Sequence, residues 1–183
     1  MIYESGPWKQ DLEKLGGILK KRSQQKRITE NACQQIEKSV FISAFIIRKL
    51  IDCASKVSDA VDGYSFQVMA FRPLRNIDRM HRRAEFEDYD WNHPQLLTAP
   101  GKDICNWLIH SYNYFFARAR NNVQSFFYVC SDYDRNKYLY KVSMDDWMNY
   151  IDFVASDSIS EMRSVYDEKK KDYIYKLKRR NNL

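Results

Sequence analysis

The feature that most constrains the fold is a set of apolar residues between Thr29 and Ser55 that recur at spacings of three and four. This period places the side chains on one face of an α-helix, whereas a half-buried strand needs a spacing of two. Phe41, Phe45 and Ile46 widen the apolar face, so we expect the helix to be buried on more than one side. Thr29 is suited to capping its first turn. The periodic positions are Ala32, Ile36, Val40, Ala44, Ile47, Ile51 and Ala54.

Three further segments show helical patterns. After the break at Pro100-Gly101, residues 103 to about 118 are strongly apolar and aromatic, and we expect a second core helix there that packs against the first. Residues 8 to 20 predict a short helix interrupted at Gly16-Gly17. Ser143 begins a sequence similar to a capping box, and apolar residues at helical spacing follow it, which predicts a third core helix.

β-Structure is predicted in two places. Residues 64 to 70 alternate apolar and polar side chains after an Asp-Gly turn, which suits a short strand. Residues 123 to 129 and 138 to 142 are rich in β-branched and aromatic residues on either side of a polar turn, which predicts a β-hairpin. Residues 72 to 90 are densely charged, and we expect loop and short helical turns. The predicted fold class is therefore mainly α, a helical bundle with a small β-hairpin near the C-terminus.

Length and composition favour one domain. A chain of 183 residues, 44% of them hydrophobic, can bury one core. We expect residues 1–157 to form this domain and residues 158–183 to form a charged, partly disordered tail.

The longest apolar run, from Val40 to Ile47, is far shorter than the ~20 residues needed to cross a bilayer, and the first residues do not resemble a secretory signal. We therefore expect a cytoplasmic protein without a membrane segment.

Positive charge is concentrated towards both ends of the chain, whose net charge is +6. Residues 161 to 183 include eight basic and four acidic side chains. Basic segments attract RNA or DNA through phosphate contacts and the release of counterions. The alternative is a solvated helix face and a solvated tail. The candidate nucleic-acid-binding residues near the N-terminus are Lys20, Lys21, Arg22, Lys26 and Arg27.

Cysteine and histidine usage argues against a metal site. Cys33, Cys53, Cys105 and Cys130 are widely spaced and form no Cys-x-x-Cys pair, so we expect reduced thiols. The three histidines do not cluster with cysteines at zinc-ligand spacing. We therefore predict neither a metal nor another cofactor.

One segment carries a candidate catalytic motif. It is Cys105-Asn106-Trp107-Leu108-Ile109-His110-Ser111-Tyr112, and it resembles the signature of HEPN domains, helical bundles often found in bacterial toxins, CRISPR effectors and antiviral proteins. That signature is Arg, four to six residues and then His, commonly with Asn directly after the Arg. In toxins that work beside a nucleotidyltransferase antitoxin it extends to Arg-Asn-x-x-x-His-x-Tyr. Asn106, His110 and Tyr112 match, whereas Cys105 occupies the Arg position.

The cysteine affects the chemistry that the resemblance implies. In HEPN ribonucleases, which need no metal, His can take the proton from a ribose 2′-hydroxyl while Arg binds the phosphate as charge develops. Asn106 and His110 are four residues apart and would share one helix face. A neutral cysteine cannot replace the bidentate, permanently charged contact of a guanidinium. We therefore expect weak or absent cleavage unless another arginine fills the gap.

A second match to the motif lies in residues 75–81, where Arg75 and Asn76 precede His81. Pro73 lies two residues upstream and the segment has little apolar surface, which favours a chance match in arginine-rich sequence. Arg75 or Arg79 is nevertheless a candidate for the missing cation.

Two functions of different classes follow. The resemblance implies an RNA-directed protein of bacterial toxin–antitoxin or phage-defence type, a homodimer with an antitoxin or defence protein as partner, and a metal-independent endoribonuclease that has lost some or all of its activity. The alternative is a non-catalytic binding or scaffold protein whose basic ends contact nucleic acid or an acidic protein. In that case His110 would be a core residue bonded to Tyr112 or to a backbone carbonyl.

Overall fold

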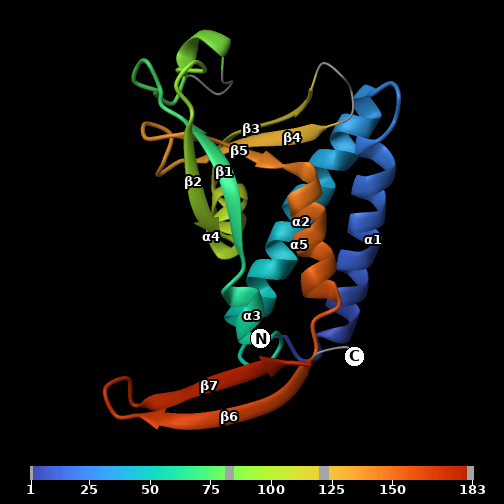
Figure 1. Cartoon of the computed structure of the whole chain (residues 1–183), viewed down its shortest axis with the longest axis vertical. Coiled ribbons are helices and arrows are strands. Elements are labelled where there is room, and N and C mark those ends of the chain that lie inside the picture. Colours follow the sequence, from blue (N-terminus) through green and yellow to red (C-terminus); the bar gives the residue numbers. More distant parts are fainter. Residues whose placement is uncertain (1, 81–84, 120–123, 181–183) are drawn as a thin grey trace.

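The protein combines three long helices with a curved antiparallel sheet in the computed structural model, which describes residues 2–80, 85–119 and 124–180 (Figure 1). The helices α1 (Gly6–Ser23), α2 (Glu30–Asp52) and α5 (Met144–Ala155) pack against one another. Helix α4 (Gly101–Ile109) packs against α2, and the short α3 (Asp59–Asp62) lies beside α4. A single 3-10 turn, η1 (Phe86–Asp88), interrupts the loop that precedes the second strand.

The sheet has five strands in the order β2-β1-β5-β4-β3, and every neighbouring pair is antiparallel. The pairs β1–β2 and β3–β4 are joined along most of their length, whereas β1 meets β5 over three residues, from Met69 opposite Lys141 to Phe71 opposite Leu139. This short pairing joins the β1–β2 hairpin to the other three strands in one open sheet, whose edge strands are β2 and β3. The strands are β1 (Ser65–Phe71), β2 (Gln95–Pro100), β3 (Ser111–Arg118), β4 (Ser125–Ser131) and β5 (Leu139–Ser143).

The core is centred on Trp147 of α5, which is fully buried between the helices and the sheet. Its indole Nε1 donates a hydrogen bond to Ser43 Oγ of α2 at 3.2 Å, which satisfies a polar group that would otherwise be buried without a partner. Its ring packs against Phe66 of β1 and Phe127 of β4. Gly16 lets α1 approach α5 closely, since a Cβ there would lie 3.3 Å from Ile151 Cγ2. One side chain of α5 thus links both layers.

The predicted fold class, a mainly α bundle with one small hairpin, is wrong. The chain is mixed α and β, with a five-stranded sheet and a separate two-stranded ribbon. The largest error concerns residues 103 to 118, for which the pattern predicts one helix, because α4 ends at Ile109 and residues 111–118 form β3. Tyr112 to Phe116 are mostly aromatic residues with high strand propensity, and pairing with β4 decides their conformation. Helix α1 also continues through Gly16-Gly17 without interruption.

Several predicted elements are present. The helix expected at 29–55 is α2, and the Thr29 hydroxyl accepts a hydrogen bond from the backbone N–H of Ala32 at 3.2 Å. Ser143 caps α5 in the same way, accepting from the N–H of Asp146. The hairpin predicted around the polar turn consists of β4 and β5, and the alternating segment at 64–70 corresponds to β1. Local pattern and capping chemistry therefore located these elements correctly.

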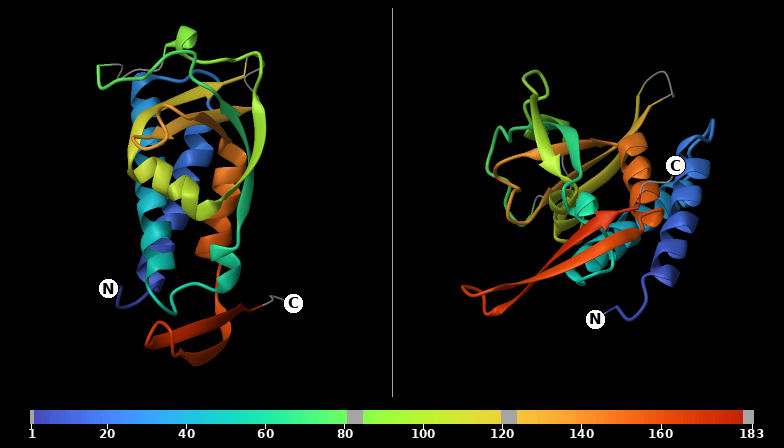
Figure 2. Two further views of the ribbon diagram at one scale, coloured as in Figure 1. Left: turned by 90° about the vertical axis from the view of Figure 1, so that its left-hand side faces the viewer. Right: turned by 60° about the horizontal axis from the view of Figure 1, so that its bottom comes forward.

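The C-terminal segment forms a two-stranded antiparallel ribbon of β6 (Ile159–Asp167) and β7 (Asp172–Arg179) that extends away from the body (Figure 2). It is attached at its base. Buried Asp157 accepts hydrogen bonds from the N–H and hydroxyl of Ser58 at 2.7 and 2.6 Å, and Arg179 Nε lies 3.7 Å from its carboxylate. The N–H of Leu177 donates to Asp59 Oδ2 at 3.1 Å. Among the described helices, none is long and apolar enough to span a membrane.

Candidate functional site

His110 lies immediately after α4, where the chain turns into β3. Its backbone N–H donates to the carbonyl of Asn106 at 3.0 Å and completes the last helical turn. The side chain is exposed rather than sealed in the core. It lines a cleft of about 230 Å³ between α4 and the last two turns of α2, to which Phe45, Arg48, Lys49 and Asp52 also contribute. His110 is therefore accessible to a ligand.

Arg48 of α2 brings a guanidinium to this cleft. Its Nε donates a hydrogen bond to Asn106 Oδ1 at 2.9 Å, and its Nη1 forms an ion pair with Asp52 one turn further along α2. The asparagine amide thus holds the guanidinium on the same side of α4 as His110. Arginine, asparagine and histidine, the three residue types of the HEPN motif, meet here although the arginine comes from a distant part of the chain.

Cys105 cannot take part in this chemistry directly. Its side chain is fully buried, and burial raises the pKa of the thiol far above its ordinary value. The positive charge of Arg48 acts in the opposite direction and lowers the same pKa, so the guanidinium lies close enough to influence position 105. The guanidinium of Arg48 is bonded to Asn106, the residue that follows position 105.

Tyr112, the third residue of the predicted site, lies elsewhere. It is on β3, and its hydroxyl donates a hydrogen bond to the carbonyl of Asp78. It lines a separate hollow of about 490 Å³ together with Arg79, Ser111 and Asp132. The change from helix to strand after His110 turns Tyr112 away from the cleft that holds Asn106 and His110.

The second match to the motif, in residues 75–81, does not come together around one cleft in the described part of the chain. Arg75 forms an ion pair with buried Asp88, and its Nη2 lies 3.7 Å from Glu85, so it ties together two ends of one loop. Arg79 belongs to the hollow at Tyr112. Asn76 is exposed in the loop after β1, and His81 falls outside the described residues. Within the motif at 75–81, Arg75 therefore has a structural role.

The basic residues near the N-terminus lie at the end of α1 and in the connection to α2. Lys20, Lys21, Lys26 and Arg27 are exposed. Arg22 is half-buried and donates from Nε to Gln35 Oε1 at 2.6 Å, so it joins α1 to α2. This end of α1 and the β6–β7 ribbon lie at opposite ends of the molecule (Figure 1). The two basic segments therefore do not form one patch.

Sequence reasoning singled out Asn106 and His110 as candidates but did not single out Arg48. The available signal was a charged residue directly after the apolar run from Val40 to Ile47, with Asp52 four residues later. Nothing in the sequence links Arg48 to Asn106, since the contact depends on how α2 packs against α4.

Within the described residues, no group of three or more His, Cys, Asp or Glu side chains could hold a metal ion. The four cysteines are free thiols. No protein family matches the chain, and no significant match exists among curated proteins or solved structures.

Proposed function

We propose that this chain is an RNA-directed protein in which Arg48, Asn106 and His110 form a metal-independent centre for cleaving RNA. The observation that carries the proposal is the hydrogen bond from Arg48 to Asn106, which places a guanidinium in the same cleft as an exposed histidine. The likeness to HEPN proteins lies in these residue types and their chemistry, because the fold is not a helical bundle.

The proposed reaction is an internal transfer at the phosphate. Neutral His110 takes the proton from a ribose 2′-hydroxyl, and the 2′-oxygen attacks the adjacent phosphorus. The bond from phosphorus to the 5′-oxygen of the next nucleotide breaks, and that oxygen takes a proton from water or from the protonated histidine. The products are a 2′,3′-cyclic phosphate and a free 5′-hydroxyl. Arg48 stabilises the negative charge that develops on the phosphate oxygens.

Asn106 is a positioning residue in this scheme. Its amide oxygen accepts from Arg48 Nε and leaves the two terminal nitrogens of the guanidinium for other partners. Asp52 already engages one of them, Nη1. We infer that the phosphate competes with Asp52 for this nitrogen, so that substrate binding releases the carboxylate to solvent.

The first experiment measures cleavage of a single-stranded RNA in EDTA. The wild type should yield fragments that end in a cyclic phosphate, and a substrate with one 2′-deoxy nucleotide should resist cleavage at that position. His110→Ala should lower the rate by roughly 10²–10⁴-fold, with little change in melting temperature because the side chain is exposed. His93→Ala is the matched control, since His93 is also exposed but pairs with Asp90 elsewhere.

Arg48 provides a second test. Arg48→Ala should lower the rate by roughly 10²–10³-fold, as the loss of one preorganised charge does in other enzymes. Arg48→Lys should recover only part of the rate, because an ammonium cannot bind a phosphate through two nitrogens. Equal rates for wild type, Arg48→Ala and His110→Ala would trace any cleavage to a contaminant and remove the proposal.

A second candidate function is RNA binding without cleavage. The ion pair between Arg48 and Asp52 favours it, because a neutralised guanidinium binds phosphate less strongly. The same assays distinguish the two functions. RNA binding that weakens with salt, together with no cyclic-phosphate product, would support the binding protein. A toxin or defence role, a homodimer and a partner protein belong to the proposal only through the resemblance.

A further inference from the structure

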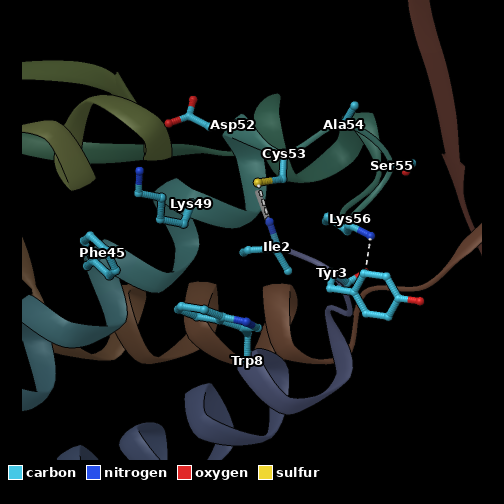
Figure 3. A pocket seen from close by; sticks show the side chains of 10 residues that line it. All are labelled: Ile2, Tyr3, Trp8, Phe45, Lys49, Asp52, Cys53, Ala54, Ser55 and Lys56. Atoms are coloured by element: carbon cyan, nitrogen blue, oxygen red, sulfur yellow. Dashed lines mark hydrogen bonds between the residues drawn. The ribbon is translucent and has the colours of Figure 1, made fainter.

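A larger groove lies next to the cleft at His110 (Figure 3). It has a volume of about 890 Å³ and is bounded by the start of the chain, the end of α2 and the connection from α2 to α3. Ile2 and Cys53 lie side by side, and the N–H of Ile2 donates to Cys53 Sγ at 3.4 Å. Ile2 and Tyr3 therefore form one side of the groove.

The groove and the cleft share one wall. Phe45, Lys49 and Asp52 line both of them, since these residues lie on successive turns of α2. A ligand that reaches across this wall contacts the groove with one part and Arg48 and His110 with another. The two hollows therefore form one continuous binding surface along the end of α2.

The side chains around the groove suit a flat apolar ring that carries an anionic group. Phe45 is 45% exposed although it is a large aromatic residue in the middle of a core helix. Trp8 of α1 is half-buried and lines the same groove (Figure 3). Exposed aromatic faces of this kind stack with nucleobases whatever their identity.

Two cations lie at the rim. Lys49 Nζ is 5.8 Å from the centroid of the Phe45 ring, and it belongs to the wall shared with the cleft. Lys56 Nζ donates to the carbonyl of Tyr3 at 2.8 Å on the other side. Asp52 adds a carboxylate that can accept hydrogen bonds from a hydroxyl or an amino group. Aromatic faces beside lysines are the combination that binds single-stranded nucleic acid.

We propose that this groove binds the base of the nucleotide that supplies the attacking 2′-hydroxyl. The base stacks on Phe45 and Trp8, Lys49 contacts the 3′-phosphate, and the ribose lies across the shared wall so that its 2′-hydroxyl faces His110. The proposal rests on the proposed function, because it assigns RNA as the ligand. Stacking rather than hydrogen bonding dominates, so we expect weak preference among the four bases.

The test uses adenosine 3′-monophosphate, which has a base and a 3′-phosphate but no bond that the protein can cleave. Isothermal titration in EDTA should show binding that is at least tenfold tighter than that of adenosine or inorganic phosphate alone. Phe45→Ala should weaken binding of the nucleotide about tenfold. Lys49→Gln should weaken binding of the nucleotide and leave adenosine unaffected. Tyr133→Ala is the matched control, because Tyr133 is an 82% exposed aromatic residue in the β4–β5 turn.

The outcomes separate this inference from the proposed cleavage. Binding of the nucleotide that depends on Phe45, without cleavage of RNA, would support the groove and remove the catalytic proposal. Cleavage that depends on His110, with nucleotide affinity unchanged in Phe45→Ala, would overturn the groove as the base site. If the nucleotide does not bind and Phe45→Ala instead changes the sedimentation coefficient, the groove is an interface between proteins and the inference is wrong.

Discussion

Position 105 shows how the packing around one side chain limits what a motif can do. Cys105 is fully buried under α2, with Arg48 close by. An arginine at position 105 would place a guanidinium in the core, close to the half-buried guanidinium of Arg48. Among the described residues, Asp52 is the carboxylate that pairs with Arg48. The arginine of the HEPN motif would therefore be buried at this position.

We predict that Cys105→Arg lowers the free energy of unfolding by several kcal/mol, because a buried charge without a partner is strongly unfavourable. Cys105→Ala should lower it by only about 1–2 kcal/mol, since it removes one buried sulfur atom and leaves a small cavity. Urea unfolding followed by tryptophan fluorescence measures both. A stable Cys105→Arg variant with faster RNA cleavage would mean that this face of α4 is open, contrary to the structure.

For individual residues, the sequence was sufficient where the bonding partner is close along the chain. Thr29 and Ser143 cap helices through bonds to residues three positions away, and both were identified. Asn106 and His110 became candidates through a pattern that is equally local, since they are one turn apart. Arg48 was missed because its partner is 58 positions distant, and no local pattern encodes that contact.

Among the elements, the junction of α4 and β3 was the hardest to predict. The apolar run from Ile104 to Phe116 contains no glycine or proline, so no breaker marks the end of the helix at Ile109. Ser111 opposite Ser131 and Phe116 opposite Phe127 show that β3 is fixed by its pairing with β4. Strand propensity depends on such neighbours more than helix propensity does. The residue pattern of one segment does not show which strand will pair with it.

Buried Asp157 is one of the residues that hold the ribbon of β6 and β7 at its base, beside Asp59, which accepts from the N–H of Leu177. We predict that Asp157→Ala lowers the free energy of unfolding by about 2–4 kcal/mol, because it leaves the N–H and the hydroxyl of Ser58 without their acceptor and removes the negative charge beside Arg179. In the Asp157→Ala variant, backbone amides should exchange hydrogen faster in β7 than in α5, since an isolated two-stranded hairpin is marginally stable. The control is Asp172→Asn, an exposed residue at the far end of the ribbon. Unchanged protection of β7 in Asp157→Ala would show that the ribbon is held by other contacts.

For the whole molecule, the separation of the two basic segments sets how RNA can bind. If this end of the molecule binds phosphates, glutamine substitutions at Lys20, Lys21, Lys26 and Arg27 should reduce the salt dependence of RNA affinity. The slope of log affinity against log salt concentration should fall by up to about 0.7 for each phosphate of a single strand that is no longer neutralised. The same change at Lys169, Lys170 and Lys171 tests the ribbon. Because these segments lie at opposite ends, a short RNA should be sensitive to only one of them. Lys14→Gln and Lys38→Gln serve as charge controls.

Alkaline pH should unfold the protein. Burial raises the pKa of the Cys130 thiol from 9.0 to about 11, and burial likewise raises the pKa of Tyr114 and Tyr150. A group whose pKa is higher in the folded state stabilises the fold fully below its unfolded pKa and ceases to do so as the pH rises through its folded pKa. Cys130 alone should therefore reduce stability by on the order of 2 kcal/mol between pH 9 and 11. Urea unfolding at several pH values measures this, and Cys130→Ala should show a smaller decline.

The architecture was less predictable than its parts. Helices α2 and α5, strand β1 and the β4–β5 hairpin follow from local pattern. The five-stranded order does not, because β1 pairs with β5 through Met69 and Lys141, and the residues between them include α4 and the strands β2, β3 and β4. Such long-range pairing is decided by which apolar faces can cover one another, and a single sequence does not display that choice.

The attachment of the ribbon at its base also determines how the molecule responds to a pulling force. Arg179, at the end of β7, lies opposite Ile159 at the start of β6, and the turn lies at the other end of the ribbon. A load on the C-terminus therefore meets the hydrogen bonds between β6 and β7 one pair after another. Strands loaded in this direction separate at low force, whereas strands sheared along their length resist together. The load first meets the contacts of Arg179 with Ser156 and Asp157 at the end of α5, so these contacts at the base must yield before the last strand peels away, and they set the force at which the ribbon opens.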